Sequence, residues 1–259
     1  MTSIRPITPT YGTRGLVQES SPGIRRVAPT FGKELYLTHS AKASGPLVVE
    51  SNSERLAAHV LSIDPRVTSF KQQPFTIDLI DRRICYTPEA LSKARVRHKG
   101  RTGIKFYTPD FSSLWTRELS VIFEVKLEGF EGDLEYQTKL EIAKEVIEAS
   151  GREFRTLVIP SSQRHPLRGN LPLLSQAMLA SNELSDSLCS AIEEVCNEQS
   201  VTTAFLCSTL EISPGLIPCL LARGVISGNL AQQHINGAMN IAYAGGDLTH
   251  LQLISEVSK

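Results

Sequence analysis

The residues best suited to chemistry are two acids and a lysine: Asp110, Glu124 and Lys126. Glu124 and Lys126 stand two apart in a run that predicts a strand, so both side chains emerge on one face. The two carboxylates and the carbonyl of Val125 are hard oxygen ligands, which suit Mg²⁺, with Mn²⁺ as a substitute. Lys126 can orient a water or stabilise charge on a phosphate. The pattern predicts metal-assisted phosphodiester hydrolysis, and a solvated strand face with a cross-strand ion pair is the alternative.

The elements that must position these residues form an α/β module over residues 49–165. Ser51 offers a helix cap, and apolar residues at helical spacing follow it. The run Leu119–Leu127 is almost continuously apolar up to Glu124, which is typical of a central strand covered on both faces. The predicted elements are a helix over 53–62, strands over 67–70, 75–80, 104–111 and 119–127, a helix over 133–149 and a strand over 154–159.

Different segments flank this module. Residues 1–48 hold six basic residues against two acidic ones and many Pro, Gly, Ser and Thr, which predicts a basic N-terminal arm with little regular structure. A surface extension packed on the module is the alternative. Residues 160–175 contain three prolines and predict a linker. Helices predicted over 184–199, 201–210 and 213–223 and a ribbon over 225–243 indicate a winged-helix-like α+β domain within 166–259.

Charge is distributed unevenly along a chain of zero net charge. Residues 181–259 contain two basic and eight acidic residues, a net charge of −6, so the remainder carries +6. Phosphate would repel the acidic domain, which favours a protein partner over DNA, and a purely structural role is the alternative. Residues 90–109 contain no acid and predict a DNA-contacting surface, with a solvated loop as the alternative. Its basic residues are Lys93, Arg95, Arg97, Lys99, Arg101 and Lys105.

Composition excludes several classes of protein. The chain has 259 residues, 41% hydrophobic and 21% charged, as in ordinary globular proteins. No apolar run reaches the ~18 residues of a membrane span, and the first residues lack the apolar core of a secretory signal. Five cysteines without a CxxC pair predict reduced thiols rather than a zinc site. The sequence has no GxxxxGK[ST] phosphate-binding loop, so we expect no nucleotide cofactor of its own.

Four short sequence elements resemble one nuclease family. They are Ser53-Glu54-Arg55, the PRVTSFKQQP stretch from Pro65 to Pro74, YTPDF from Tyr107 to Phe111, and FEVK from Phe123 to Lys126. The acid–acid–lysine pattern is similar to that of the PD-(D/E)xK nuclease superfamily. Together the elements resemble the TnsA-type endonuclease subunit of Tn7-like transposons over about residues 50–160. The resemblance implies a restriction-endonuclease-like mixed sheet flanked by helices, with the catalytic set Glu54, Asp110, Glu124 and Lys126.

The resemblance also implies a function. A protein of this family cuts the strand carrying the 5′ transposon end, while a DDE transposase (TnsB-like) cuts and joins the 3′ ends. The C-terminal domain would contact an AAA+ regulator (TnsC-like), and the protein would act in the bacterial cytoplasm. Glu54 would join the metal ligands, although an ion pair with Arg55 is the alternative. The rival functions are a stand-alone restriction or repair nuclease of the same fold and a non-catalytic DNA-binding assembly factor.

Overall fold

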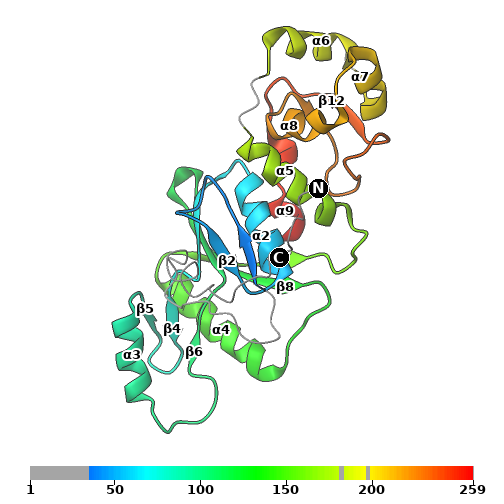
Figure 1. Ribbon diagram of the computed structural model, residues 1–259. Helices are drawn as coiled ribbons and strands as arrows, with labels where there is room; N and C mark the ends of the chain where they lie inside the picture. The colour runs from blue at the N-terminus through cyan, green and yellow to red at the C-terminus, as the bar shows by residue number, and fades with distance from the viewer. Residues whose placement is uncertain (1–34, 181–183, 197–198, 259) are drawn as a thin grey trace, which may run out of the picture.

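The computed structural model describes residues 35–180, 184–196 and 199–258. The protein is mixed α/β and elongated (Figure 1): a four-stranded sheet with its helices lies in the middle, and smaller modules lie at the two ends. Most of the predicted N-terminal arm falls on residues 1–34, outside the described residues. The last part of the arm forms a hairpin of β1 (Tyr36–Thr38) and β2 (Leu47–Val49), so it has more regular structure than we predicted.

The central sheet has the strand order β3-β7-β8-β9. Its members are β3 (Val67–Gln72), β7 (Phe111–Trp115), β8 (Ser120–Leu127) and β9 (Glu153–Ile159). The strands β8 and β9 are parallel, because α4 (Leu134–Ala149) carries the chain back between them, and the other neighbours are antiparallel. The helix α2 (Asn52–Ile63) confirms the helix predicted over 53–62.

The side chains of β8 alternate between two hydrophobic cores. Val121 and Phe123 belong to the core that contains α2, whereas Ile122 belongs to the core that contains α4. All three are 0% exposed, so β8 is a central strand covered on both faces, as the apolar run predicted. The same alternation places Glu124 and Lys126 on the face that α4 covers.

A module with its own three-stranded sheet is inserted between β3 and β7, and we call it the α3 module. It comprises β4 (Thr76–Asp78), β5 (Arg83–Cys85), α3 (Pro88–Arg97) and β6 (Phe106–Tyr107), with strand order β5-β4-β6. The single strand predicted over 104–111 is therefore wrong. Its two halves, β6 and the start of β7, belong to different sheets, and Pro109 between them has no N–H for a strand ladder.

The linker predicted over 160–175 is also wrong, because α5 (Pro166–Leu179) occupies most of it. Pro166 stands at the first helical position, where its missing N–H costs nothing. Asn170 ties the helix to a distant loop: its side chain donates to the carbonyls of Leu230 and Gln233 at 2.9 and 2.7 Å. Tertiary contacts thus stabilise a helix in a segment whose proline content predicted a linker.

Beyond α5 lies a smaller module of helices around a three-stranded antiparallel sheet of order β10-β12-β11 (Figure 1). Its elements are α6 (Asp186–Cys196), β10 (Val201–Thr202), α7 (Thr203–Leu210), the 3-10 turn η2 (Pro214–Leu216), α8 (Ile217–Ala222), β11 (Ile226–Ser227) and β12 (Asn240–Tyr243). Of the ribbon predicted over 225–243, only the two ends form strands, β11 and β12. We call the span from α6 to β12 the C-terminal module.

The chain then returns to the central sheet. A short helix α9 (Ile254–Val257) packs near β9, and Ser258 bridges Leu157 of β9. The amide of Ile254 donates to the carboxylate of the fully buried Asp64, just after α2, at 3.2 Å. One hydrophobic core consequently runs from α2 through α5 and α8 to α9.

Candidate active site

Asp110 is fixed at the point where three strands meet. Its backbone N–H donates to the carbonyl of Phe123 on β8 at 3.1 Å, and its carbonyl accepts from Gln73 after β3 at 2.8 Å. Its carboxylate accepts the N–H of Val125 at 2.7 Å. Gln73 makes its contact from a left-handed backbone conformation (φ 42°), which is uncommon for a residue other than glycine and recurs at functional sites. The predicted pairing of Asp110 with the Glu124–Lys126 strand is thus present.

Glu124 is held by two tyrosines that the sequence analysis assigned no role. Its side chain is buried, with 6% of the residue exposed. The hydroxyl of Tyr107, the last residue of β6, donates to Oε2 at 2.5 Å. The hydroxyl of Tyr136, in the first turn of α4, donates to Oε1. The two hydroxyls thus donate to different oxygens of the same carboxyl group and fix its orientation. The sequence offered one indication that Tyr107 lies at the site, because this residue belongs to the YTPDF element.

Glu54 lies in the first turn of α2, where it also completes a helix cap. The hydroxyl of Ser51 accepts the Glu54 N–H at 3.1 Å and donates to its Oε1 at 2.9 Å, while Oε2 accepts the N–H of Glu50 at 3.1 Å. This arrangement is related to a capping box, but Glu54 accepts the N–H of the residue before the N-cap rather than that of the N-cap Ser51 itself. The alternative ion pair with Arg55 does not occur in the part of the chain that the structure describes: the Arg55 guanidinium lies 4.7 Å from the centre of the Tyr36 ring.

The three carboxylates repel one another electrostatically. Burial raises the pKa of Asp110 well above its usual range, and the charges of Glu124 and Glu54 raise it further against the Val125 hydrogen bond. Burial also raises the pKa of Glu54, with the charges of Glu50 and Glu124 adding to the effect, although its hydrogen bonds oppose it. Glu50, at the end of β2, is thus a fourth acid near the site that the sequence analysis did not identify. A divalent cation would relieve this repulsion.

Lys126 shares the face of β8 with Glu124, as predicted. Its ammonium lies 4.9 Å from the centre of the Tyr136 ring, a cation–π contact. A second lysine, Lys139 of α4, lies 4.0 Å from the same ring centre and 5.3 Å from that of Tyr107. Val125, which we predicted as a carbonyl ligand, contributes its N–H to Asp110, while the role of its carbonyl stays a prediction.

No family model matches this chain, and no curated protein matches it. The functional argument therefore rests on the geometry of the site and on the sequence elements described above. Within the described ranges, no single helix is long and apolar enough to span a membrane. The helical pair Thr203–Leu210 and Pro214–Ala222 meets that criterion only together and is bent by 120° at its break.

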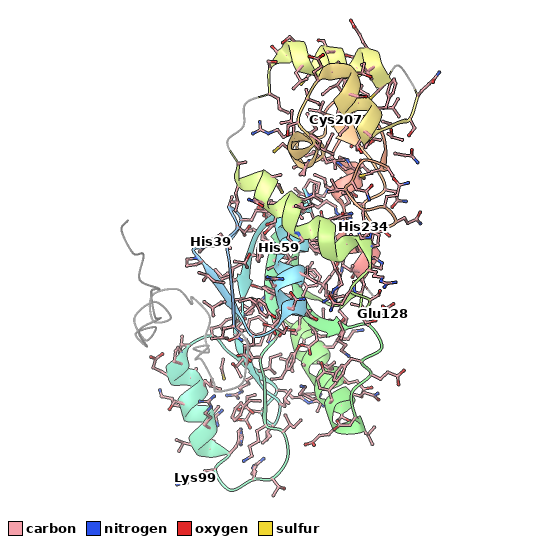
Figure 2. The ribbon with its side chains drawn as sticks, turned by 45° about the vertical axis from the view of Figure 1, so that its right-hand side comes forward. His39, His59, Lys99, Glu128, Cys207 and His234 are labelled. Carbon is pink, nitrogen blue, oxygen red and sulfur yellow. The ribbon has the colours of Figure 1, made fainter. Side chains whose placement is uncertain are left out.

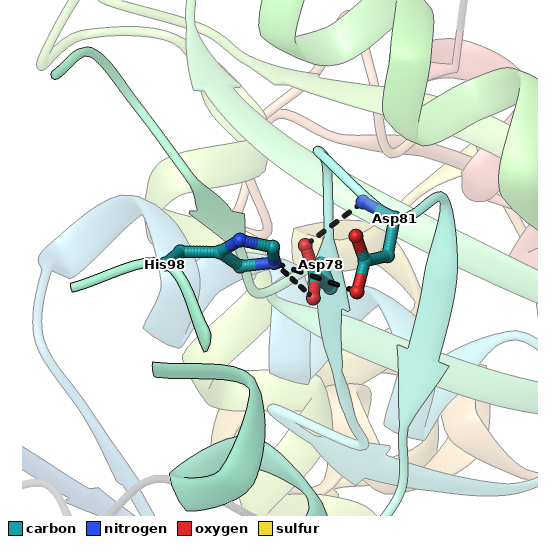
Figure 3. Close-up of side chains that lie close together, drawn as sticks. All are labelled: Asp78, Asp81 and His98. Atoms are coloured by element: carbon teal, nitrogen blue, oxygen red, sulfur yellow. Dashed lines mark hydrogen bonds and ion pairs between the residues drawn. The ribbon is translucent and has the colours of Figure 1, made fainter. Parts of the chain in front are cut away.

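A second cluster of possible metal ligands lies in the α3 module: Asp78, Asp81 and His98 (Figure 3). Their ligand atoms lie within 4.8 Å of one another, and they are the only three-residue group that tight among the described residues, so Glu54, Asp110 and Glu124 are spread more widely. The His98 ring lies 2.9 Å from Asp78, and Arg97 lies 2.8 Å from Asp81. An imidazole ring and a guanidinium group therefore already face the two carboxylates, as in a polar cluster that fastens α3 to its sheet.

The electrostatics of Asp78 agree with a structural cluster. Burial raises its pKa, but hydrogen bonds from the Asp81 N–H and the His98 ring outweigh that effect, and the pKa is lowered overall. The Asp81 N–H donates to the carboxylate at 3.1 Å, and the N–H of Ile80 donates to it at the same distance. Asp78 is thus stabilised as an anion without a metal, in contrast to Asp110.

The six predicted DNA-contacting residues fall into two groups. Arg97 is engaged with Asp78 and Asp81, and the Lys105 ammonium donates to the carbonyl of His98 at 3.1 Å. The other four, like Arg97 itself, are exposed: Lys93, Arg95, Lys99 and Arg101. Figure 2 shows Lys99 at the far tip of the α3 module, away from Glu128, which follows β8. The exposed charges thus extend outward from the sheet that carries the candidate site.

Proposed function

We propose that this chain is a magnesium-dependent endodeoxyribonuclease that cuts the 5′ strand at transposon ends, together with a TnsB-like transposase and a TnsC-like AAA+ ATPase. The observation that carries the proposal is the environment of Asp110. Its carboxylate accepts the N–H of Val125, next to Glu124 on β8, and burial together with the charges of Glu124 and Glu54 raises its pKa. Lys126, on the same strand as Glu124, supplies the one further group that phosphodiester hydrolysis needs.

The donor set fits a hard divalent cation. Asp110, Glu124 and Glu54 offer carboxylate oxygens, and no sulfur ligand stands among them. When bound, Mg²⁺ or Mn²⁺ supplies a Lewis acid for phosphodiester hydrolysis. Among the protein's own groups, the Val125 N–H holds the Asp110 carboxylate, and Lys126 offers its ammonium to an attacking water or to the charge that grows on the phosphate.

The architecture agrees with this proposal. A mixed sheet with helices on both faces, and an acid–acid–lysine set at the ends of β7 and β8, is the arrangement that the PD-(D/E)xK resemblance implies. The order α6, β10, α7, α8, β11, β12 agrees with the winged-helix-like domain that we propose for this part of the chain. Five of the six residues of α8 are buried, so this helix offers little surface to a DNA groove. With the net charge of −6 over residues 181–259, this supports a protein partner for the C-terminal module.

Strand-specific cleavage of a labelled transposon end tests the proposal. The assay uses Mg²⁺ and the transposase and ATPase partners, and compares wild type with Asp110→Asn and Lys126→Ala. Lys144→Ala is the matched control, because Lys144 is an exposed lysine of α4 paired only with Glu148 within the described chain. We expect both site variants to lose the 5′-strand cut by about 100-fold or more while the 3′ cut and joining continue.

Two outcomes would replace the proposal with a rival. Equal cutting by wild type and both variants would assign the chemistry to a partner and make this chain an assembly factor. Efficient cutting of unrelated DNA without any partner would favour a stand-alone nuclease of the same fold.

A further inference from the structure

Tyr136 contacts both chemical groups of the candidate site. Its hydroxyl donates to Oε1 of Glu124, and its ring lies 4.9 Å from the Lys126 ammonium. Glu124 and Lys126 project from the same face of β8 toward α4, so one aromatic side chain at the start of that helix can reach both. Sequence spacing alone gives no reason for this tyrosine to matter.

Several contacts hold Tyr136 in place. Its backbone N–H donates to the carboxylate of Asp133, the N-cap of α4, at 2.7 Å. The ring of Phe130 packs edge-on against it with centroids 5.5 Å apart, and the Lys139 ammonium lies 4.0 Å from its ring centre. A side chain restrained at its backbone and its ring can impose a fixed direction on the groups that it touches.

Tyr107 provides an internal comparison. It donates to the other oxygen of Glu124, yet the cations near its ring include Lys139 and not Lys126 among the contacts of the described residues. The two tyrosines therefore share the task of holding Glu124, whereas the contact with Lys126 belongs to Tyr136.

We infer that Tyr136 is a positioning residue with two separable tasks: its hydroxyl orients Glu124 for the divalent cation, and its ring orients Lys126 for the phosphate. The inference rests on the proposed nuclease function. Each carboxylate oxygen has two lone pairs, so Oε1 can accept the hydroxyl and still coordinate a cation. Carboxylate ligands in metal sites are commonly hydrogen-bonded by such neighbours, whose loss costs 10–100-fold in metal affinity or activity.

The two tasks are separated by two substitutions at one position. Tyr136→Phe removes the hydroxyl and keeps the ring, whereas Tyr136→Leu removes both. Tyr107→Phe is the comparison at the second tyrosine. Tyr86→Phe is the matched control, because Tyr86 is half-exposed in the α3 module and its hydroxyl accepts only from Arg152 among the described contacts.

Two measurements are made on the full-length protein. Calorimetric titration with Mn²⁺ gives the metal affinity without any cleavage, and the partner-dependent cleavage assay gives the rate at saturating Mg²⁺. We expect Tyr136→Phe and Tyr107→Phe to weaken Mn²⁺ binding about tenfold or more and to keep the saturated rate within about threefold. Tyr136→Leu should weaken Mn²⁺ binding similarly and also lower the saturated rate about tenfold or more, because Lys126 is no longer held in place.

Each of the two tasks assigned to Tyr136 can be contradicted by these measurements. Unchanged or tighter Mn²⁺ binding by Tyr136→Phe would contradict the Glu124 task, and tighter binding would identify the hydroxyl as a latch that withholds Glu124 from the cation. Equal saturated rates for the Phe and Leu variants would contradict the Lys126 task. If wild type binds Mn²⁺ but cuts no DNA, the proposed nuclease function is wrong. The Mn²⁺ titration would still show whether the Tyr136 hydroxyl orients Glu124. If wild type binds no Mn²⁺, both ideas are wrong.

Discussion

Replacing Asp110 with asparagine should stabilise the metal-free protein while abolishing its response to Mg²⁺. The asparagine oxygen can still accept the Val125 N–H, so the change removes mainly the charge. Burial, with the charges of Glu124 and Glu54 adding to it, raises the pKa of Asp110 well above its usual range. Each tenfold change in proton affinity corresponds to about 1.4 kcal/mol. For a protein of this size, a gain of about 1.4 kcal/mol corresponds to about 3 °C in Tm, and we expect an increase of a few degrees.

The second part of this prediction concerns Mg²⁺, which should stabilise wild type but not Asp110→Asn. At a concentration of about 100 times its Kd, a cation that binds only the folded state stabilises it by about 2.7 kcal/mol, or about 5 °C or more in Tm. Wild type should show this increase with Mg²⁺, and Asp110→Asn should not. Trp115 is the single tryptophan and is 7% exposed, so its fluorescence reports unfolding of the central sheet directly.

The pH dependence follows from the same raised pKa. Between the usual carboxyl pKa and the raised value, the folded protein holds the Asp110 proton and the unfolded chain does not. The folded state therefore binds more protons there, and metal-free stability falls as the pH rises through this window. The variant should show a shallower fall. Asp186→Asn, an exposed acid in the first turn of α6, is the control and should lower stability slightly. A lower Tm for Asp110→Asn than for wild type without metal would refute the reasoning.

Three further predictions concern other parts of the molecule. His98→Ala removes a donor from the buried Asp78 carboxylate and should lower the unfolding free energy in urea by about 2–3 kcal/mol; the exposed ion-pair variant Arg82→Ala should change it by less than about 1 kcal/mol. The double variant Lys93→Gln, Lys99→Gln should reduce the slope of log DNA affinity against log salt concentration by about two. An unchanged slope would show that these two lysines do not contact DNA. Deleting residues 252–259 removes three buried apolar side chains and should destabilise the whole protein by about 4 kcal/mol or more, whereas retained thermal stability would show the chain end to be dispensable.

Sequence patterns predicted the centre of the fold well. The apolar run of β8 and the capped periodicity of α2 gave those two elements to within a few residues, because burial on both faces or on one face leaves a direct signature. The predicted relation of Asp110 to Glu124 and Lys126 also holds, since neighbouring strands place these residues together. The tyrosines that hold Glu124 come from β6 and α4, elements whose approach depends on tertiary packing rather than on local spacing.

The failures have identifiable physical causes. We predicted no helix over α3 because its many basic residues suggested a loop, although Thr87 and Pro88 supplied an N-cap and a favourable first position. The prolines of residues 160–175 suggested a linker, but one begins α5 and Asn170 anchors that helix through bonds to residues 60 and 63 positions away. Such long-range bonds leave no trace in a local window of sequence.

Because the chain returns to the central sheet, the C-terminal module is attached to it at two places. The C-terminal module leaves through α5, which packs against α2, and comes back through α9, which lies by β9. A body joined at two points cannot swivel as one on a single tether can. A partner that grips the C-terminal module therefore also fixes the direction in which α2 presents Glu54. Under the proposed function, the span between the two would act as a ruler, and the position of the cut would be set by this rigid distance from the bound partner.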